Sequence, residues 1–329
     1  MLDSRVPARP TAAATARNPG TPLDLEWVLG LRVNRSAVER RTGTLGTRRS
    51  VKKEWQAAWL LRAVRLMDLT TLEGGDTPGR VRRLVAKARR PVRDDLLDAL
   101  GMGDAGLTVA AVCVYPALVP TVRAALAEAP IHVAAVAAGF PHGLSPLEQR
   151  IAEVEAAVRA GADEIDIVIQ RSHVLRGEWQ ALYDEVRAFR DACGDAHLKT
   201  ILATGELGPL RNVARASAVC MMAGADFIKT STGKERVNAT LPVGLTMVRT
   251  LRAYVERTGY PVGFKPAGGV RSAKDALLWM ILMKEELGRE WLEPERFRFG
   301  ASSLLNDIER QLEHHLTGRY SASFRHPLA

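Results

Sequence analysis

Short apolar segments alternate with amphipathic, helix-like stretches along most of the chain. From Val64 onward, each apolar segment ends in a polar or glycine-containing turn, and a helix-like stretch such as "SPLEQRIAEVEAAVRAGA" then follows. The eight apolar segments are 66–72, 109–116, 132–141, 164–170, 197–207, 226–232, 262–269 and 297–303. Strands that alternate with helices favour βαβ units and a parallel sheet.

Eight such units over roughly 250 residues predict an α/β fold of the (β/α)8 TIM-barrel type. A doubly wound sheet is the structural alternative, but its GxGxxG turn after the first strand is missing. We predict a barrel domain over residues 64–316, preceded by an N-terminal helical extension over residues 23–63. Residues 1–22 are rich in Ala, Pro, Thr and Arg and are predicted to be a disordered tail. Residues 317–329 form a predicted C-terminal tail.

Three predicted strands carry a lysine in an otherwise apolar setting. Lys199, Lys229 and Lys265 lie on the fifth, sixth and seventh segments, which neighbour one another in a barrel. A single lysine on a strand more often marks a solvated edge, but three lysines on neighbouring strands favour a chemical role. Burial and like charges both lower a lysine pKa, and a lysine with a lowered pKa can form a Schiff base with a carbonyl. Position alone does not say which lysine is the nucleophile.

An aspartate accompanies these lysines on the fourth segment. In "EIDIVI" the isoleucines share one face and Asp166 points the other way, into the barrel. Its carboxylate could move protons at the carbon next to an imine. Taken alone, Asp166 is as well explained as a hydrogen-bonded polar group inside a barrel.

Three turns at the same predicted end of the barrel indicate a phosphate site. They span residues 231–234, 266–272 and 300–303 and follow the last three strands. Barrels often bind phosphate in the loops after strands seven and eight, at a helix N-terminus. Lys234, Arg271 and Ser302 could add direct contacts. Each turn alone is a weak signal, since such residues usually mark a tight turn or a cap.

Composition narrows the class of protein. The net charge is +9, but the basic residues are scattered and aromatic residues make up only 5%, so no nucleic-acid partner is predicted. No apolar run reaches 18 residues, so no membrane span is predicted. The three cysteines suggest reduced thiols in a cytoplasmic protein. There is no HxH or HExxH pair, so neither a metal site nor another cofactor is predicted.

Long motifs strengthen this interpretation. The segments "DFIKTSTGK", "GFKPAGGVRS", "FGASSLL", "LMDLTTL", "AVCVYP" and "TGEL" resemble the deoxyribose-phosphate aldolase family, over about Leu66 to Ile308. The stretches "NPGTPLDLEW" and "LYDEVRAFRDACG" look like the longer animal-type branch of that family. The turn "VIQRS" departs from the aromatic-proline turn of many bacterial members, and Tyr320 is the candidate substitute for a C-terminal tyrosine that assists proton transfer in some relatives.

The resemblance implies a TIM barrel and a metal-free, class I lyase. Its expected reaction is the reversible cleavage of 2-deoxy-D-ribose 5-phosphate to acetaldehyde and D-glyceraldehyde 3-phosphate, in deoxyribonucleoside catabolism. It implies that Lys229 forms the Schiff base, that Lys265 tunes its pKa and shares proton transfer, and that Asp166 relays protons. The implied phosphate contacts are Gly233, Lys234, Gly268, Gly269, Gly300 and Ser302. The implied pocket-lining residues are Asp68, Thr70, Cys113 and Lys199, the last near the imine.

Two other hypotheses stay open at this stage. One is a Schiff-base barrel aldolase that uses a different phosphorylated donor. The other is a basic scaffold or RNA-binding barrel, which would leave the convergent lysines unexplained. The expected partner is a small phosphorylated sugar, and a homodimer is a possible assembly that the sequence does not decide.

Overall fold

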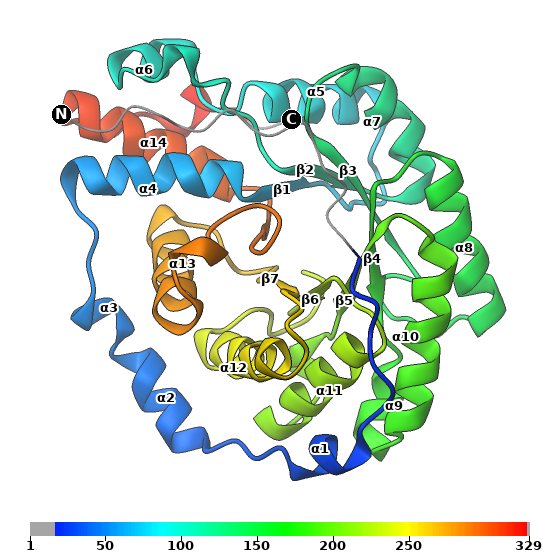
Figure 1. Ribbon diagram of the computed structural model, residues 1–329. Coiled ribbons are helices and arrows are strands. Elements are labelled where there is room, and N and C mark those ends of the chain that lie inside the picture. Colours follow the sequence, from blue (N-terminus) through cyan, green and yellow to red (C-terminus); the bar gives the residue numbers. More distant parts are fainter. Residues whose placement is uncertain (1–16, 328–329) are drawn as a thin grey trace.

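Eight parallel strands form the centre of the computed structural model, which describes residues 17–327 (Figure 1). The strands are β1 (Met67–Thr70), β2 (Ala111–Val114), β3 (His132–Ala137), β4 (Glu164–Val168), β5 (His197–Ile201), β6 (Phe227–Lys229), β7 (Gly263–Lys265) and β8 (Phe299–Ala301). Their order is β7-β6-β5-β4-β3-β2-β1-β8, and parallel bridges from Phe264 to Phe297 and from Ala267 to Gly300 close the ring. The predicted TIM barrel is confirmed, with strands shorter than the apolar segments suggested.

Helices surround this barrel, one or more after each strand. They are α5 (Pro78–Arg89), α6 (Asp94–Ala99), α7 (Val119–Leu126), α8 (Leu147–Arg159), α9 (Arg171–Arg176), α10 (Trp179–Cys193), α11 (Leu210–Met222), α12 (Leu241–Thr258), α13 (Ala273–Leu287) and α14 (Leu304–Thr317). Residues of opposite strand faces enter two separate apolar clusters. Ile165 and Ile167 pack outward against the helices, whereas Val168 lies with Cys113 and Ile201 inside the barrel.

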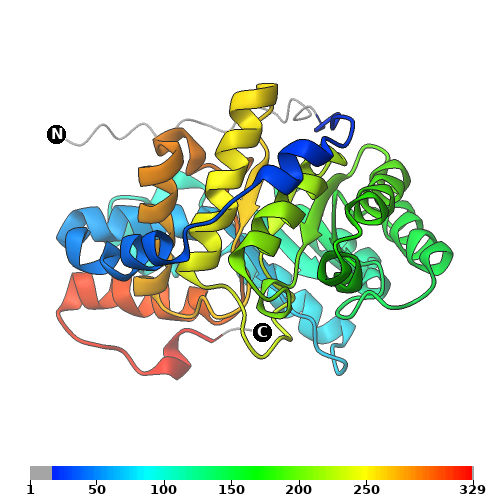
Figure 2. The ribbon, with the colours of Figure 1, turned by 90° about the horizontal axis from the view of Figure 1, so that it is seen from below.

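The first helices of the N-terminal extension lie outside the ring of helices, whereas its last helix lies between α13 and α14 (Figure 1 and Figure 2). It comprises α1 (Leu25–Gly30), α2 (Arg35–Gly43), α3 (Leu45–Arg48) and α4 (Lys53–Arg65). α1 contacts α11, α2 contacts α12, and α4 packs against α13 and α14. The helical extension therefore wraps one side of the barrel, and α4 leads directly into β1.

The segment just before the extension corrects the predicted tail boundary. Residues 1–16 lie outside the described residues, but residues 17–22 pack on the domain. Asn18 is only 1% exposed, and its side-chain amide donates to the carbonyls of Met221 and Ala225, at 2.8 Å each. Its Oδ1 accepts from the Tyr254 hydroxyl at 3.1 Å, and its backbone N–H donates to Asp226 at 2.7 Å. One buried amide side chain thus ties this segment to the α11–β6 connection.

We expect Asn18→Ala to lower the free energy of unfolding by about 2–4 kcal/mol, because several buried polar groups lose their partner together. Urea unfolding of the purified chain measures this loss. Asn34→Ala is the matched control, since Asn34 only caps α2 at the exposed surface. A loss for Asn18→Ala no larger than the control value would show that the segment contributes little to stability.

The C-terminal segment packs back on the barrel domain. α14 runs to Thr317, and the chain then turns back along it. His326 is fully buried, and its Nε2 lies 2.8 Å from Glu313 on α14. Tyr320 is 65% exposed and stacks on His314, away from the barrel interior. Within residues 17–327, no helix is both long and apolar enough to span a bilayer.

Candidate active site

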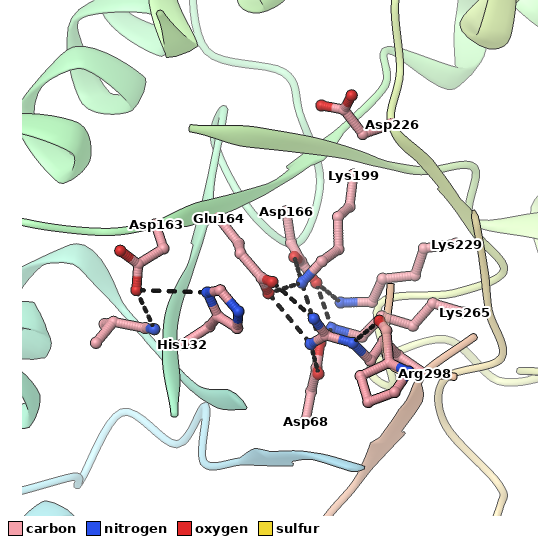
Figure 3. A network of polar contacts seen from close by, with 12 residues as sticks. Asp68, His132, Asp163, Glu164, Asp166, Lys199, Asp226, Lys229, Lys265 and Arg298 are labelled. Atoms are coloured by element: carbon pink, nitrogen blue, oxygen red, sulfur yellow. Dashed lines mark hydrogen bonds and ion pairs between the residues drawn. The ribbon is translucent and has the colours of Figure 1, made fainter. Parts of the chain in front are cut away.

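Side chains from β4, β6 and β7 meet inside the barrel, at the C-terminal ends of the strands. Lys229 and Lys265 are the last residues of β6 and β7 and lie side by side in the sheet register. Nζ of Lys229 donates to Asp166 Oδ2 at 2.7 Å, and Nζ of Lys265 donates to the same oxygen at 2.8 Å. Figure 3 shows both ammonium groups pointing toward this carboxylate. The structure therefore brings together the three residues that sequence reasoning placed at the centre of the chemistry.

Asp68 and Lys199 complete the inner face of this cluster. Asp68, on β1, contacts Lys265 through Oδ2 and lies 3.1 Å from Nζ of Lys199 through the same oxygen. Nζ of Lys199 lies 3.2 Å from Asp166 Oδ1 and also donates to Glu164. Lys199 is thus held by three carboxylates and fully buried, which makes it a fixed cation.

Sequence reasoning missed two members of the cluster, Glu164 and Arg298. Nη2 of Arg298 donates to Glu164 Oε1 at 2.9 Å, and Nη1 donates to Asp68 Oδ1 at 2.6 Å. The alternation of strand residues could have found both. Glu164 is two residues before Asp166, and Arg298 is two before Gly300, so each shares the inward face with a predicted site residue.

The pKa values separate the three lysines. Burial lowers the pKa of Lys229, and the nearby positive charge of Lys265 lowers it further. The negative charge of Asp166 raises it, but not enough to reverse the shift. Burial also opposes the charge on Lys265, but Asp166 and Asp68 outweigh it and raise its pKa. The same balance, with Glu164 added, raises the pKa of Lys199. Crowding among the lysines therefore does not lower the pKa of Lys199 or Lys265, because carboxylates are interleaved among them.

The buried charges nearly cancel. The cluster contains the carboxylates Asp68, Glu164 and Asp166 and the cations Lys199, Lys229, Lys265 and Arg298. Three negative charges face four positive ones, so full ionisation leaves one positive charge in excess. A neutral amine on Lys229 removes this excess, and a buried site favours that state over an uncompensated charge.

Burial would raise the pKa of Asp166, yet the three surrounding lysines hold it well below its usual range. Asp166 is therefore an anion at neutral pH. Its Oδ1 accepts no hydrogen bond within the part of the chain that the structure describes. Oδ2 accepts from two lysines and Oδ1 lies 3.2 Å from the ammonium of Lys199, so both oxygens of this carboxylate face lysines.

Two further predicted pocket residues line the same end of the barrel. Cys113 is fully buried on β2, and burial, with help from Asp166, raises the pKa of its thiol. The thiol is consequently neutral and serves as a small apolar wall beside the lysines. Thr70 ends β1, half-buried, and its hydroxyl donates to the carbonyl oxygen of Asp68 at 2.8 Å.

The predicted phosphate-binding residues follow β6, β7 and β8 at the mouth of the barrel, except Gly300, which lies within β8. Gly233, Gly268 and Gly269 have φ angles of +83°, +73° and +83°, a region that favours glycine. A Cβ on Gly300 would come within 2.8 Å of Ala267 Cβ, so these two turns approach too closely for a side chain there. Ser302 is exposed just before α14. The three turns therefore do lie at one end of the molecule.

The two helices at this mouth differ in how their N-termini are capped. Ser272 and Asp275 form a capping box on α13, and Asp307 accepts the N–H of Ala273 at 2.7 Å. No side chain caps α14, which starts right after Ser303. Lys234 lies at the same mouth, with its Nζ 2.7 Å from Glu73 Oε1. Within residues 17–327 the start of α14 has no side-chain cap, which makes it the better anion site of the two.

A search of residues 17–327 finds no group of three His, Cys, Asp or Glu side chains arranged to hold a metal ion. The charged cluster itself is filled by its own ammonium and guanidinium groups. Its carboxylates are thereby occupied, and the cluster offers imine and proton-transfer chemistry.

Comparisons with known proteins identify a family of aldolases. Residues 62–310 match the model of the DeoC/LacD family of aldolases. The chain is 60% identical to human deoxyribose-phosphate aldolase, over 96% of this chain and all of that protein, and 61% identical to the mouse protein, over 94% and 98%. A solved structure of a putative deoxyribose-phosphate aldolase from Toxoplasma gondii is similar in fold, with a TM-score of 0.67 at 22% identity, covering 83% of this chain and 99% of that one. This chain belongs to the DeoC/LacD family of aldolases.

Proposed function

We propose that this chain is a deoxyribose-phosphate aldolase. It would cleave 2-deoxy-D-ribose 5-phosphate reversibly to acetaldehyde and D-glyceraldehyde 3-phosphate, in deoxyribonucleoside catabolism. The observation that carries the proposal is the buried amine of Lys229, whose pKa is lowered while those of its neighbours are raised. Mammalian relatives at about 60% identity bear the name of this activity, along their full length.

The proposed reaction begins with the neutral amine of Lys229. The amine attacks the C1 aldehyde of the open-chain sugar, and loss of water gives an imine. Removal of the proton on the C3 hydroxyl then allows the C2–C3 bond to break, which releases D-glyceraldehyde 3-phosphate. The electron pair stays on the imine carbons as an enamine. Protonation at C2 and hydrolysis release acetaldehyde and restore Lys229.

Asp166 and Lys265 are proposed to move these protons. Asp166 is an anion within hydrogen-bond distance of both amines, so it can accept a proton from one group and return it to another. Lys265 stays protonated at neutral pH because its pKa is raised, and can therefore donate to a developing hydroxyl. Lys199 and Asp68 keep these groups in place, next to Thr70 and Cys113.

The phosphate of the substrate is proposed to lie at the mouth of the barrel. The proposed contacts are Gly233, Lys234, Gly268, Gly269, Gly300 and Ser302. Support comes from the uncapped start of α14 and from glycine backbone that approaches closely at this end. A negatively charged group there would also replace Glu73 as the partner of Lys234.

We further propose that the protein acts in the cytoplasm without a cofactor. The three cysteines are all unpaired and buried, as expected for reduced thiols. A homodimer stays a prediction. Relatives of this fold do assemble, as in the tetrameric deoxyribose phosphate aldolase from Aeropyrum pernix, at 23% identity and a TM-score of 0.59 over 85% of this chain and 99% of that one.

Borohydride reduction in the presence of acetaldehyde tests the proposal. We expect a single ethyl adduct on the peptide that contains Lys229, found by peptide mass mapping. Lys284, an exposed lysine on α13, is the internal control and should stay unmodified under the same limiting reagent. An adduct on Lys265 or Lys199 would keep the reaction class and reassign the nucleophile. Folded protein without any adduct would refute imine chemistry, and an adduct only with another aldehyde or ketone would change the donor.

A further inference from the structure

The ion pair of Glu164 and Arg298 lies below the reacting groups and takes no direct part in the proposed chemistry. Glu164 is the first residue of β4, whereas Lys229 and Lys265 are the last residues of their strands. Figure 3 shows the guanidinium of Arg298 and the carboxylate of Glu164 next to Asp68 and Lys199. Both side chains are buried, at 3% and 0% exposure. We infer that Glu164 and Arg298 are positioning residues that set the pH range in which Lys229 reacts.

A continuous line of contacts connects Arg298 to the proposed nucleophile. Arg298 occupies Oδ1 of Asp68 at 2.6 Å, which leaves Oδ2 to hold Lys265. Lys265 in turn shares Oδ2 of Asp166 with Lys229. A change at Arg298 therefore reaches Lys229 through Asp68, Lys265 and Asp166.

Glu164 acts through the neighbouring lysine. It receives hydrogen bonds from Lys199 and from Nη2 of Arg298, the latter at 2.9 Å. Lys199 also contacts Asp68 and Asp166. Without the charge of Glu164, the ammonium of Lys199 would be neutralised by Asp68 and Asp166 alone and would interact with them more strongly. Less negative potential would then remain for Lys265 and Lys229.

The other groups that face the cluster do not supply the charges of Glu164 and Arg298. They are His132 on β3, His197 on β5, Cys113 on β2 and the ring of Phe227 on β6, which lies near both Lys199 and Arg298. Burial lowers the pKa of His197 to about 3, so this histidine is neutral at ordinary pH. Burial raises the pKa of Cys113, so its thiol is neutral as well. Because the buried charges balance with a neutral Lys229, removing one charged member shifts that balance.

A buried ion pair can serve only to fill space in a defined way, and replacement by uncharged groups is then often neutral for stability. A purely structural role therefore predicts a different experimental result. A purely structural pair would change the amount of folded protein or the rate, and would leave the pH dependence unmoved. The pH profile therefore separates the two roles.

The test rests on the proposed function and uses the rate of borohydride-trapped imine formation with acetaldehyde, measured against pH. Glu164→Gln keeps the shape and removes one negative charge. We expect its acid limb to move to lower pH by about one unit, the size of effect that one charge exerts across a protein interior. Arg298→Gln removes one positive charge and is expected to move the limb to higher pH. Glu164→Asp keeps the charge and should retain the wild-type midpoint.

The double variant Glu164→Gln/Arg298→Gln restores the charge count, so its midpoint is expected near the wild-type value. If one single variant does not fold, the other still tests the inference, because each has its own expected direction of shift. Unmoved midpoints in folded single variants would overturn the inference. If only the double variant folds, a midpoint that differs from the wild-type value would overturn it as well. Absence of any Lys229 adduct in the wild-type protein would instead refute the proposed function.

Discussion

Lys229→Arg is expected to lower kcat/KM for 2-deoxy-D-ribose 5-phosphate by about 10⁵–10⁶-fold, the loss typical when a covalent nucleophile is removed. Arginine keeps a positive charge, but its guanidinium does not lose its proton in proteins and forms no imine under these conditions. The measurement is the cleavage rate, with acetaldehyde detected by a coupled reduction. Borohydride trapping of the same variant should give no adduct.

The matched control is Lys284→Arg, which makes the same substitution at an exposed site. Lys284 lies over the ring of Trp59, a contact that arginine also makes well. Its rate should equal the wild-type rate. A Lys229→Arg variant that retains more than about one hundredth of the wild-type rate would exclude Lys229 as the nucleophile, because general acid–base roles alone account for effects of 10²–10⁴-fold.

Asp166→Asn is expected to lower kcat/KM by about 10²–10⁴-fold, the contribution typical of a positioned proton-transfer group. The pH dependence should shift at the same time. Asp166 raises the pKa of Lys229, so its removal lowers that pKa further below the ordinary lysine value of 10.5. The neutral amine then persists to lower pH, and the acid limb of the trapping rate should move in that direction. The variant would form the imine more readily at low pH and cleave the sugar poorly.

Asp226→Asn is the matched control for a lost buried carboxylate. Asp226 lies just before β6, pairs with Arg190 at 2.8 Å and accepts the backbone N–H groups of Asn18 and Leu198. Its substitution should cost stability in urea unfolding and leave kcat/KM per folded molecule unchanged. An Asp166→Asn variant that loses stability alone, with wild-type kcat/KM and an unmoved acid limb, would show that Asp166 only supports the fold.

Much of the fold was predictable because strand and helix periodicity is local. Each inner strand reads as an apolar run between turns, and eight of them admit few closed arrangements. The ends of the chain were less predictable. Asn18 lies in a polar, proline-containing segment with no apolar periodicity. It is nevertheless buried, and it donates hydrogen bonds to the carbonyls of Met221 and Ala225, which are about two hundred residues further along the chain. Local composition contains no information about such distant partners.

The sequence by itself determined the barrel, the strands that carry the lysines, and the inward direction of Asp166, since all three follow from repeats and two-residue alternation. Only the tertiary structure decided that the pKa of Lys229 is lowered while those of Lys199 and Lys265 are raised. That distinction depends on where Asp68, Glu164 and Arg298 place their charges, across strands far apart in the chain. Electrostatic interactions depend on distance through space and on burial, so three chemically identical side chains acquire different pKa values only after the barrel has closed.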